Sequence, residues 1–205
     1  MDLRLSTDNM NDYLSVSSII DYNNDLIKEL AEQINREKKD EIDLIKSTFE
    51  YVRDNIHHSA DIKGSIVTCN ASEVLRFKEG ICYAKSHLLA ALLRYNGIPV
   101  GFCYQKLILC DETAPYVIIH GLNGVFISSI NRWIRLDARG NKEGVNAQFN
   151  LNEEQLAFPV RIELGEEDLP IIYDKPDYNV VEKLKKHDKV EELFEDLPRS
   201  LSTEL

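Results

Sequence analysis

The sequence predicts an α+β fold in which helices come first and antiparallel strands follow. Three observations predict this order. Residues 24–95 carry apolar side chains at helical spacing, residues 101–136 carry short β-branched and aromatic runs between turn residues, and residues 177–205 return to helical spacing. Helices and strands that are grouped rather than alternating are typical of an α+β fold.

Length and composition favour one globular domain. The chain has 205 residues, of which 43% are hydrophobic, and a domain of this size typically buries about 70% of its unfolded surface. No Gly/Ser/Pro linker divides it. We therefore expect a single domain over residues 1–205, with a core at about 24–175. Residues 1–12 are expected to be a flexible arm, and 177–205 an acidic helix.

Two amphipathic helices are expected before residue 60. Asn24 is in position to cap the first. The second follows a charged break at residues 36–41, and its apolar positions step by three and four residues, as one buried face of a helix requires. These positions are Ile42, Ile45, Phe49, Val52 and Ile56.

Two further helices are expected between residues 70 and 95. Asn70–Glu73 resembles a capping box and predicts a short helix through about Phe77. After Gly80, a longer helix is predicted from Cys82 to Tyr95, and its apolar residues cover so wide an arc that most of it should be buried. Asn96-Gly97 should end this helix in the left-handed conformation.

Strands are expected from residue 101 onward. We predict two hairpin turns, at Asn123-Gly124 and at Ser128–Asn131. The predicted strands are Gly101–Leu109, Tyr116–Ile119, Gly124–Ile127, Arg132–Leu136 and Phe158–Leu164.

Charge and hydropathy exclude several classes of protein. The formal net charge of −11 argues against a nucleic-acid or anionic-membrane partner, which would need clustered Lys and Arg. No run of about 18 apolar residues is present. Residues 1–8 lack a basic region followed by an apolar stretch, so we expect no secretory signal and a cytoplasmic location.

No metal or cofactor site is expected. The four cysteines, Cys69, Cys82, Cys103 and Cys110, form no CxxC pair and no zinc-ligand spacing. The pair His57-His58 lacks the acidic or thiol neighbours that would complete a metal site and reads as a loop. No glycine-rich phosphate loop is present. Free thiols in a reducing compartment are therefore expected.

Cys82 is the one cysteine with a chemical interpretation. A thiol in the first turn of a helix faces unpaired N–H groups and the positive end of the helix dipole, which stabilise thiolate, the nucleophilic form. Gly80 permits a tight approach to the helix and leaves room for a substrate carbonyl. The Cys82 N–H is in position to support a developing oxyanion. A buried structural thiol is the alternative.

His120 and Asp137 follow two predicted strands and are candidates to activate Cys82. An imidazole beside a thiol accepts its proton, and a carboxylate on the far ring nitrogen fixes the tautomer and supports imidazolium. The strands must lie side by side in a suitable register, which sequence cannot specify. The alternatives are a surface or satisfied core histidine and a turn-forming aspartate.

These motifs together resemble the transglutaminase-like superfamily. They are Gly80–Ser86, Leu92–Pro99, the His120 segment and Trp133–Asp137, in that order, and the stretch after Asp137 resembles the small bacterial members. The resemblance implies a papain-like α+β fold in which the nucleophile helix packs on an antiparallel sheet carrying the histidine and aspartate. Cys82 would be nucleophile, His120 base and acid, and Asp137 the residue that orients His120.

The resemblance implies acyl transfer on a peptide or protein amide, through a thioester. We favour hydrolysis, as by a protease or amidase, over cross-linking. A catalytically silent binding domain of the same fold and a purely structural module are the alternatives. His120-Gly121-Leu122-Asn123-Gly124 lacks the aromatic and acidic residues that the family often has after its histidine. Gln105 and Asn70 are the candidates for a second oxyanion donor.

Overall fold

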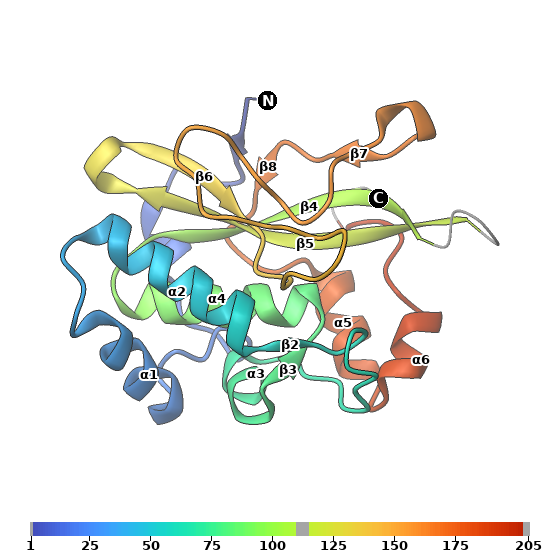
Figure 1. Ribbon diagram of the computed structural model, residues 1–205, viewed down its shortest axis with the longest axis horizontal. Helices are drawn as coiled ribbons and strands as arrows, with labels where there is room; N and C mark the ends of the chain where they lie inside the picture. Colours follow the sequence, from blue (N-terminus) through green and yellow to red (C-terminus); the bar gives the residue numbers. More distant parts are fainter. Residues whose placement is uncertain (1, 110–114, 203–205) are drawn as a thin grey trace.

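The structure, a computed structural model, describes residues 2–109 and 115–202. Its α-helices lie on one side of a four-stranded sheet (Figure 1). The helices are α1 (Asp25–Asn35), α2 (Glu41–Asn55), α3 (Ala71–Phe77), α4 (Cys82–Tyr95), α5 (Tyr178–Lys186) and α6 (Val190–Glu195).

The four-stranded sheet is antiparallel throughout, so the α+β prediction is confirmed. Its strands lie in the order β6-β5-β4-β7. They are β4 (Val100–Leu109), β5 (Tyr116–Ile127), β6 (Arg132–Leu136) and β7 (Glu167–Asp168).

The predicted helices before residue 96 form where their capping residues place them. The side chain of Asn24 accepts a hydrogen bond from the Leu26 N–H at the start of α1. Asn70 and Glu73 form the capping box of α3. Each cap satisfies an N–H that has no partner inside its own helix.

Helix α4 is the centre of the core. Every residue from Tyr83 to Arg94 is buried, because α4 packs against α1, α2 and α3 on one side and β5 on the other. The helix is followed by Gly97 in the left-handed region, with φ of +75°, as the sequence predicts. Its two end residues, Cys82 and Tyr95, are half-buried rather than buried.

Strand β5 is continuous through Asn123-Gly124, so the predicted turn there is wrong. Asn123 is buried, and its Nδ2 donates to the carbonyls of Ser86 and Gly101. A Cβ on Gly124 would lie 2.8 Å from the Ile172 side chain. Both residues are therefore required by packing. The second predicted turn is present, as the 3₁₀ turn η2 (Ser128–Ile130) with Asn131 at φ of +49°.

The N-terminal segment is ordered, which corrects the prediction of a flexible arm over residues 1–12. Strand β1 (Arg4–Leu5) pairs in parallel with β8 (Ile171–Ile172), and the 3₁₀ helix η1 covers Met10–Leu14. Tyr13 is buried and donates from its hydroxyl to the Ile172 carbonyl, 3.1 Å away. Backbone pairing with a distant strand leaves no pattern in the local sequence.

The C-terminal segment forms two helices, α5 and α6, where the sequence predicts one acidic helix over 177–205. The chain between them pairs with residues 65–67: Val67 N–H donates to the Asp188 carbonyl, and Val190 N–H to that of Ser65. Helix α5 ends in a basic turn rather than an acidic one. Both helices lie below the ends of β4 and β5 (Figure 1).

The predicted strand at Phe158–Leu164 is also wrong. Ile162–Leu164 is the 3₁₀ turn η3, ended by Gly165 at φ of +87°, and residues 158–161 are irregular. Phe158 instead packs its ring against His120. The apolar run is explained by this contact, not by a sheet.

Replacing Leu89 by Ala should lower the free energy of unfolding by about 2–5 kcal/mol, because truncating a buried leucine leaves a cavity. Leu89 is fully buried in α4, whereas Leu26 in α1 is 39% exposed. Leu26→Ala is therefore the matched control and should cost much less. Urea denaturation of both variants measures the difference, and equal losses would contradict the central placement of α4.

Candidate active site

The backbone before α4 holds Cys82 at the helix start. Strand β2 (His57–His58) pairs in parallel with β3 (Glu79–Gly80). A Cβ on Gly80 would lie 2.9 Å from both Ala84 Cβ and Thr68 Oγ1, so only glycine fits. The first N–H groups of any α-helix lack intrahelical acceptors. Those of α4 therefore remain available beside the sulfur.

Lys85, one turn after Cys82, joins α4 to the end of α2. Its side chain is fully buried, and its Nζ donates to the carbonyls of Ile56 and Arg53. Burial, reinforced by the nearby Arg139 charge, lowers the pKa of Lys85 to about 7. Lys85 thus satisfies carbonyls that the end of α2 leaves unpaired.

Strand register brings His120 and Asp137 together. In the antiparallel β5–β6 pair Asn123 lies opposite Leu136. Because the strands run in opposite directions, Asp137, which follows Leu136, lies beside the part of β5 that precedes Asn123 and contains His120. His120 Nε2 lies 2.8 Å from Asp137 Oδ2. The two side chains are buried, with 3% and 1% of the residues exposed.

Two backbone groups fix the Asp137 carboxylate. The N–H of Arg139 donates to Oδ1 and that of Ala157 donates to Oδ2, each at 3.1 Å. The ring of Phe158 packs edge-on against His120, with centroids 5.2 Å apart. The carboxylate is therefore hydrogen-bonded on both oxygens, and the imidazole is fixed in orientation by an apolar neighbour.

Electrostatics favour the charged pair. Burial alone would lower the pKa of His120, but the Asp137 carboxylate and the Cys82 thiol outweigh it and raise that pKa to about 10. Burial alone would raise the pKa of Asp137, but His120 and the two backbone N–H groups hold it below its usual value. The arrangement thus favours imidazolium and carboxylate near neutral pH.

Cys82 and His120 line the same cavity, and Cys82 is one of the groups that raise the pKa of His120. His120 Nε2 is engaged by Asp137, so Nδ1 is the ring nitrogen that can exchange a proton with the thiol. The structure therefore brings all three predicted site residues together. In chemical terms, this is an arrangement in which a thiol can be deprotonated and a leaving group can be protonated.

A cavity of about 510 Å³ opens over Cys82 and His120, and its walls are mostly apolar. This volume is in the usual range for small-molecule and peptide side-chain sites, about 300–1,000 Å³. The apolar walls comprise Leu107, Ile108, Leu109, Ile118, Phe158, Pro159, Phe194 and Leu197.

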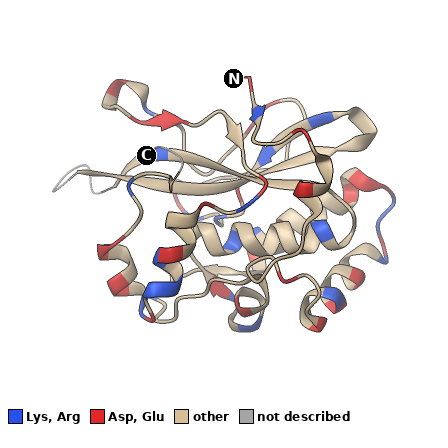
Figure 2. Ribbon diagram, turned by 180° about the vertical axis from the view of Figure 1, so that it is seen from behind, with Lys and Arg blue, Asp and Glu red and all other residues tan. Residues whose placement is uncertain are grey.

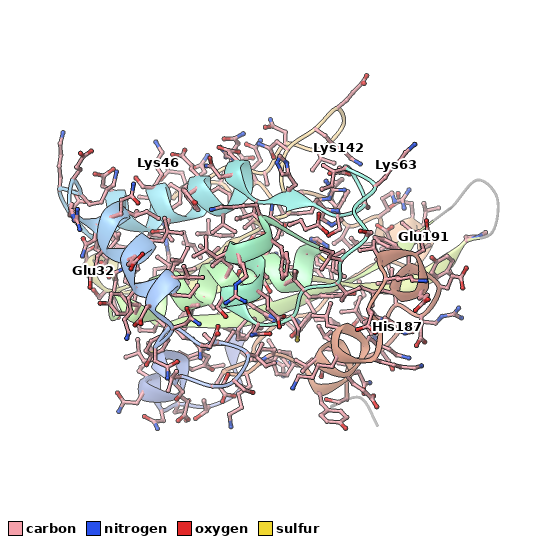
Figure 3. All side chains as sticks on the ribbon, turned by 90° about the horizontal axis from the view of Figure 1, so that it is seen from below. Glu32, Lys46, Lys63, Lys142, His187 and Glu191 are labelled. Carbon is pink, nitrogen blue, oxygen red and sulfur yellow. The ribbon has the colours of Figure 1, made fainter. Side chains whose placement is uncertain are left out.

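Two ion-paired groups lie at the cavity. Arg139 and Lys142 line it and share the carboxylate of Asp61. Arg161 lines it as well and pairs with Glu166, whose Oε1 also accepts from the Ile108 N–H. Figure 3 shows Lys142 projecting outward near the end of α2. In the view of Figure 2, acidic and basic residues are interspersed rather than gathered on one face.

Neither candidate for a second oxyanion donor lines the cavity. Gln105 lies directly opposite His120 in the β4–β5 register and is buried. Asn70 is occupied in the capping box of α3. Sequence reasoning also assigned His58 to a loop, whereas it lies in β2 and lines the cavity. A two-residue parallel bridge has no sequence signature that would have revealed this.

The other cysteines differ from Cys82 in their surroundings. Cys69 and Cys103 are buried free thiols, and burial raises the pKa of each to about 12. Cys110 lies outside the described residues. Within residues 2–109 and 115–202, no three His, Cys, Asp or Glu side chains gather as a metal site would need. In the same ranges, no helix is both long and apolar enough to cross a bilayer.

Comparisons with known proteins relate the chain to a family and to two solved structures. The family model described as "Transglutaminase-like superfamily" matches residues 28–138. A structure described as a candidate cysteine protease from Cytophaga hutchinsonii superposes with a TM-score of 0.52 at 19% identity, covering 65% of this chain and 43% of its own. We find no significant match among curated proteins.

A second solved structure is the periplasmic domain of TgpA from Pseudomonas aeruginosa, bound to ethylmercury. It superposes with a TM-score of 0.45 at 15% identity and covers 62% of this chain and 46% of its own. The chain therefore spans less than half the length of either solved structure.

In the folded protein, iodoacetamide should alkylate Cys82 far faster than Cys69 or Cys103. Cys82 is half-buried at the cavity, whereas the other two are buried with raised pKa values and so carry almost no thiolate at neutral pH. Peptide mapping by mass spectrometry after timed alkylation gives the three rates. Similar rates in the native state would contradict an accessible, activated Cys82.

The stabilisation from the His120–Asp137 pair should be lost in alkali. Because the pKa of His120 is raised from 6.5 to about 10, the native state binds more protons than the unfolded chain between these values. Stability from this group is therefore complete below about pH 6.5 and falls as the pH rises through about 10.

Urea denaturation across this pH range measures the loss, with His120→Gln as the control. The variant lacks the titrating group, so its free energy of unfolding should fall less steeply with pH, even though its absolute stability is lower. Identical slopes for the two proteins would show that His120 is not held as imidazolium.

Proposed function

The chain belongs to the transglutaminase-like superfamily, and from that premise we propose that it hydrolyses peptide amides through a thioester on Cys82. The observation that carries the proposal is that Cys82 and His120 line one cavity, while the buried Asp137 contacts His120 at 2.8 Å. We favour hydrolysis over cross-linking, with Cys82 as nucleophile, His120 as base and acid, and Asp137 as the residue that orients His120.

The first half of the reaction forms the acyl-enzyme. The Cys82 thiolate attacks the carbonyl carbon, a C–S bond forms, and the π electrons move to the carbonyl oxygen. When the tetrahedral intermediate collapses, the C–N bond breaks and His120 gives its Nδ1 proton to the departing nitrogen. The Asp137 carboxylate keeps Nε2 protonated and the ring in place, so that Nδ1 is the nitrogen that exchanges the proton.

The second half releases the acid. His120, now neutral, takes a proton from a water molecule whose oxygen attacks the thioester carbon. The C–S bond then breaks, the carboxylic acid leaves, and Cys82 returns as thiolate beside imidazolium. Each proton that His120 donates in the first half is recovered from water in the second.

Local charge supports water rather than a lysine amine as the second nucleophile. Arg139 and Lys142 line the cavity and share one carboxylate, that of Asp61, so this group carries a net positive charge of one. A substrate ammonium would be repelled here, whereas water is not. This contrast supports an amidase or protease over a cross-linking enzyme.

The walls of the cavity favour an apolar residue in the acyl part of the substrate. Ile118, Phe158 and Phe194 contribute aliphatic and aromatic surface beside Cys82. Burying an apolar side chain there is favourable, whereas a charged side chain would lose its hydration without a partner. A peptide substrate also accords with the protease description of the Cytophaga hutchinsonii structure. The free thiols of Cys69, Cys82 and Cys103 suit the cytoplasmic location that we include in the proposal.

Peptide amides that differ only in the residue contributing the scissile carbonyl test the proposal. Those with Leu or Phe at this position should be cleaved with kcat/KM at least about 10-fold above those with Asp or Lys, a typical discrimination by an apolar pocket. Chromatography of the amine released over time measures the rates. Equal rates for all four peptides would contradict the assigned pocket.

Two variants control this experiment. Cys82→Ala should abolish cleavage by several orders of magnitude and leave the thermal melt nearly unchanged. Asp137→Asn should lower activity less but should also lower stability. In the wild type, backbone N–H groups donate to both Oδ1 and Oδ2. In the variant one of these oxygens becomes an amide NH₂, so one buried N–H loses its acceptor. If Cys82→Ala unfolds the protein while Asp137→Asn is silent, Cys82 is a core residue and a binding domain is the better assignment.

A further inference from the structure

A second histidine, His58, is held next to the nucleophile. In the β2–β3 pair it lies opposite Gly80. Gly80 is two residues before Cys82 in the chain. The N–H groups of His57 and Ser59 donate to the carbonyls of Lys78 and Gly80, at 2.8 and 3.3 Å. His58 and Cys82 line the same cavity. The backbone that positions the thiol therefore also positions this imidazole.

The His58 ring has no hydrogen-bond partner among the described residues. The residue is 9% exposed, and its Nδ1 is buried without a partner. Nε2 likewise makes no hydrogen bond within residues 2–109 and 115–202, but it is not among the buried unpaired atoms and so retains access to the cavity. Buried polar groups are nearly always paired. An unpaired one at a cavity indicates that a ligand completes its hydrogen bonds.

The charges around His58 keep it neutral. Burial and the cations Arg139 and Lys85, with a small contribution from His120, lower its pKa to about 3, against the opposing effect of Asp61. A neutral imidazole is too weak a base to compete with His120 for the thiol proton. It can still donate one N–H hydrogen bond.

We propose that His58 is a catalytic residue of the reaction proposed above, donating its Nε2–H to the carbonyl oxygen of the acyl donor as that oxygen becomes negative. The carbonyl oxygen gains the π electron pair when the Cys82 sulfur bonds to carbon, and it returns the pair when the C–N bond breaks. His58 keeps its proton throughout. Together with the Cys82 N–H it supplies two donors to the oxyanion, a contribution that is strong in the transition state and weak in the ground state.

This role belongs to His58 rather than to Gln105 or Asn70, the two candidates from the sequence. Neither of these lines the cavity. His58 combines a cavity position, an unpaired ring and a backbone attachment to the Cys82 loop. The inference rests on the proposed function, since an oxyanion arises only if Cys82 attacks a carbonyl.

Two reagents separate oxyanion support from thiol activation. p-Nitrophenyl acetate acylates Cys82 through an oxyanion and releases p-nitrophenolate, whereas iodoacetamide alkylates the same sulfur by displacement of iodide without one. His58→Phe, which fills the space but has no donor, should slow acylation by about 10²–10³-fold, the usual loss for one oxyanion donor. Its iodoacetamide rate should stay at the wild-type value. His58→Asn, which restores an N–H donor, should recover part of the acylation rate.

The neighbouring His57→Phe is the matched control, because His57 is exposed, and both of its rates should equal those of the wild type. Unchanged acylation in His58→Phe, or equal losses of acylation and alkylation, would overturn the role of His58. Cys69 and Cys103 remaining unreactive in the variant shows that it is folded. No acylation of the wild-type protein would overturn the proposed function and this inference together, so the two failures are distinct.

Discussion

The buried ion pair between His120 and Asp137 is the interaction on which the rest of the site depends. Removing two charges from water is costly, and the attraction between them offsets that cost only when geometry and further hydrogen bonds are good. Here the register of β5 and β6 sets the 2.8 Å contact, and the N–H groups of Arg139 and Ala157 complete the carboxylate. The edge-on ring of Phe158 adds apolar cover. The pair places an imidazolium at the cavity that Cys82 also lines.

The nucleophile is positioned by a separate set of constraints. Helix α4 is buried from Tyr83 to Arg94, so it cannot shift without disturbing the core, and the sulfur lies at its half-buried N-terminal end. Gly80 allows the chain to pass close to Ala84 and Thr68, and the β2–β3 pairing attaches that turn to the chain after α2. Helix α4 thus fixes the position of the sulfur, and the sheet carries the charged His120–Asp137 pair. The cavity lies where the two meet.

Sequence reasoning reached the elements whose signals are local. The bounds of α4 followed from apolar spacing and from Gly97, and the three site residues followed from motif order. It failed at Asn123-Gly124, a pair of residues that is typical of a turn. Here Asn123 instead hydrogen-bonds to α4, and Gly124 leaves space for the Ile172 side chain. It also failed where distant backbones pair, as in the N-terminal strand, the break between α5 and α6, and the bridge that brings His58 to the cavity. Such pairings depend on tertiary structure and leave no periodic trace.

Mass spectrometry of the acid-quenched reaction with an apolar peptide ester tests the central claim most directly. If the buried pair activates Cys82 as a nucleophile, the intact protein should gain the mass of the acyl group early in the reaction. Digestion should then locate that group on Cys82 as a thioester that hydroxylamine removes. Turnover of the ester with the acyl group on another residue, or with no acyl-protein formed at all, would contradict the account.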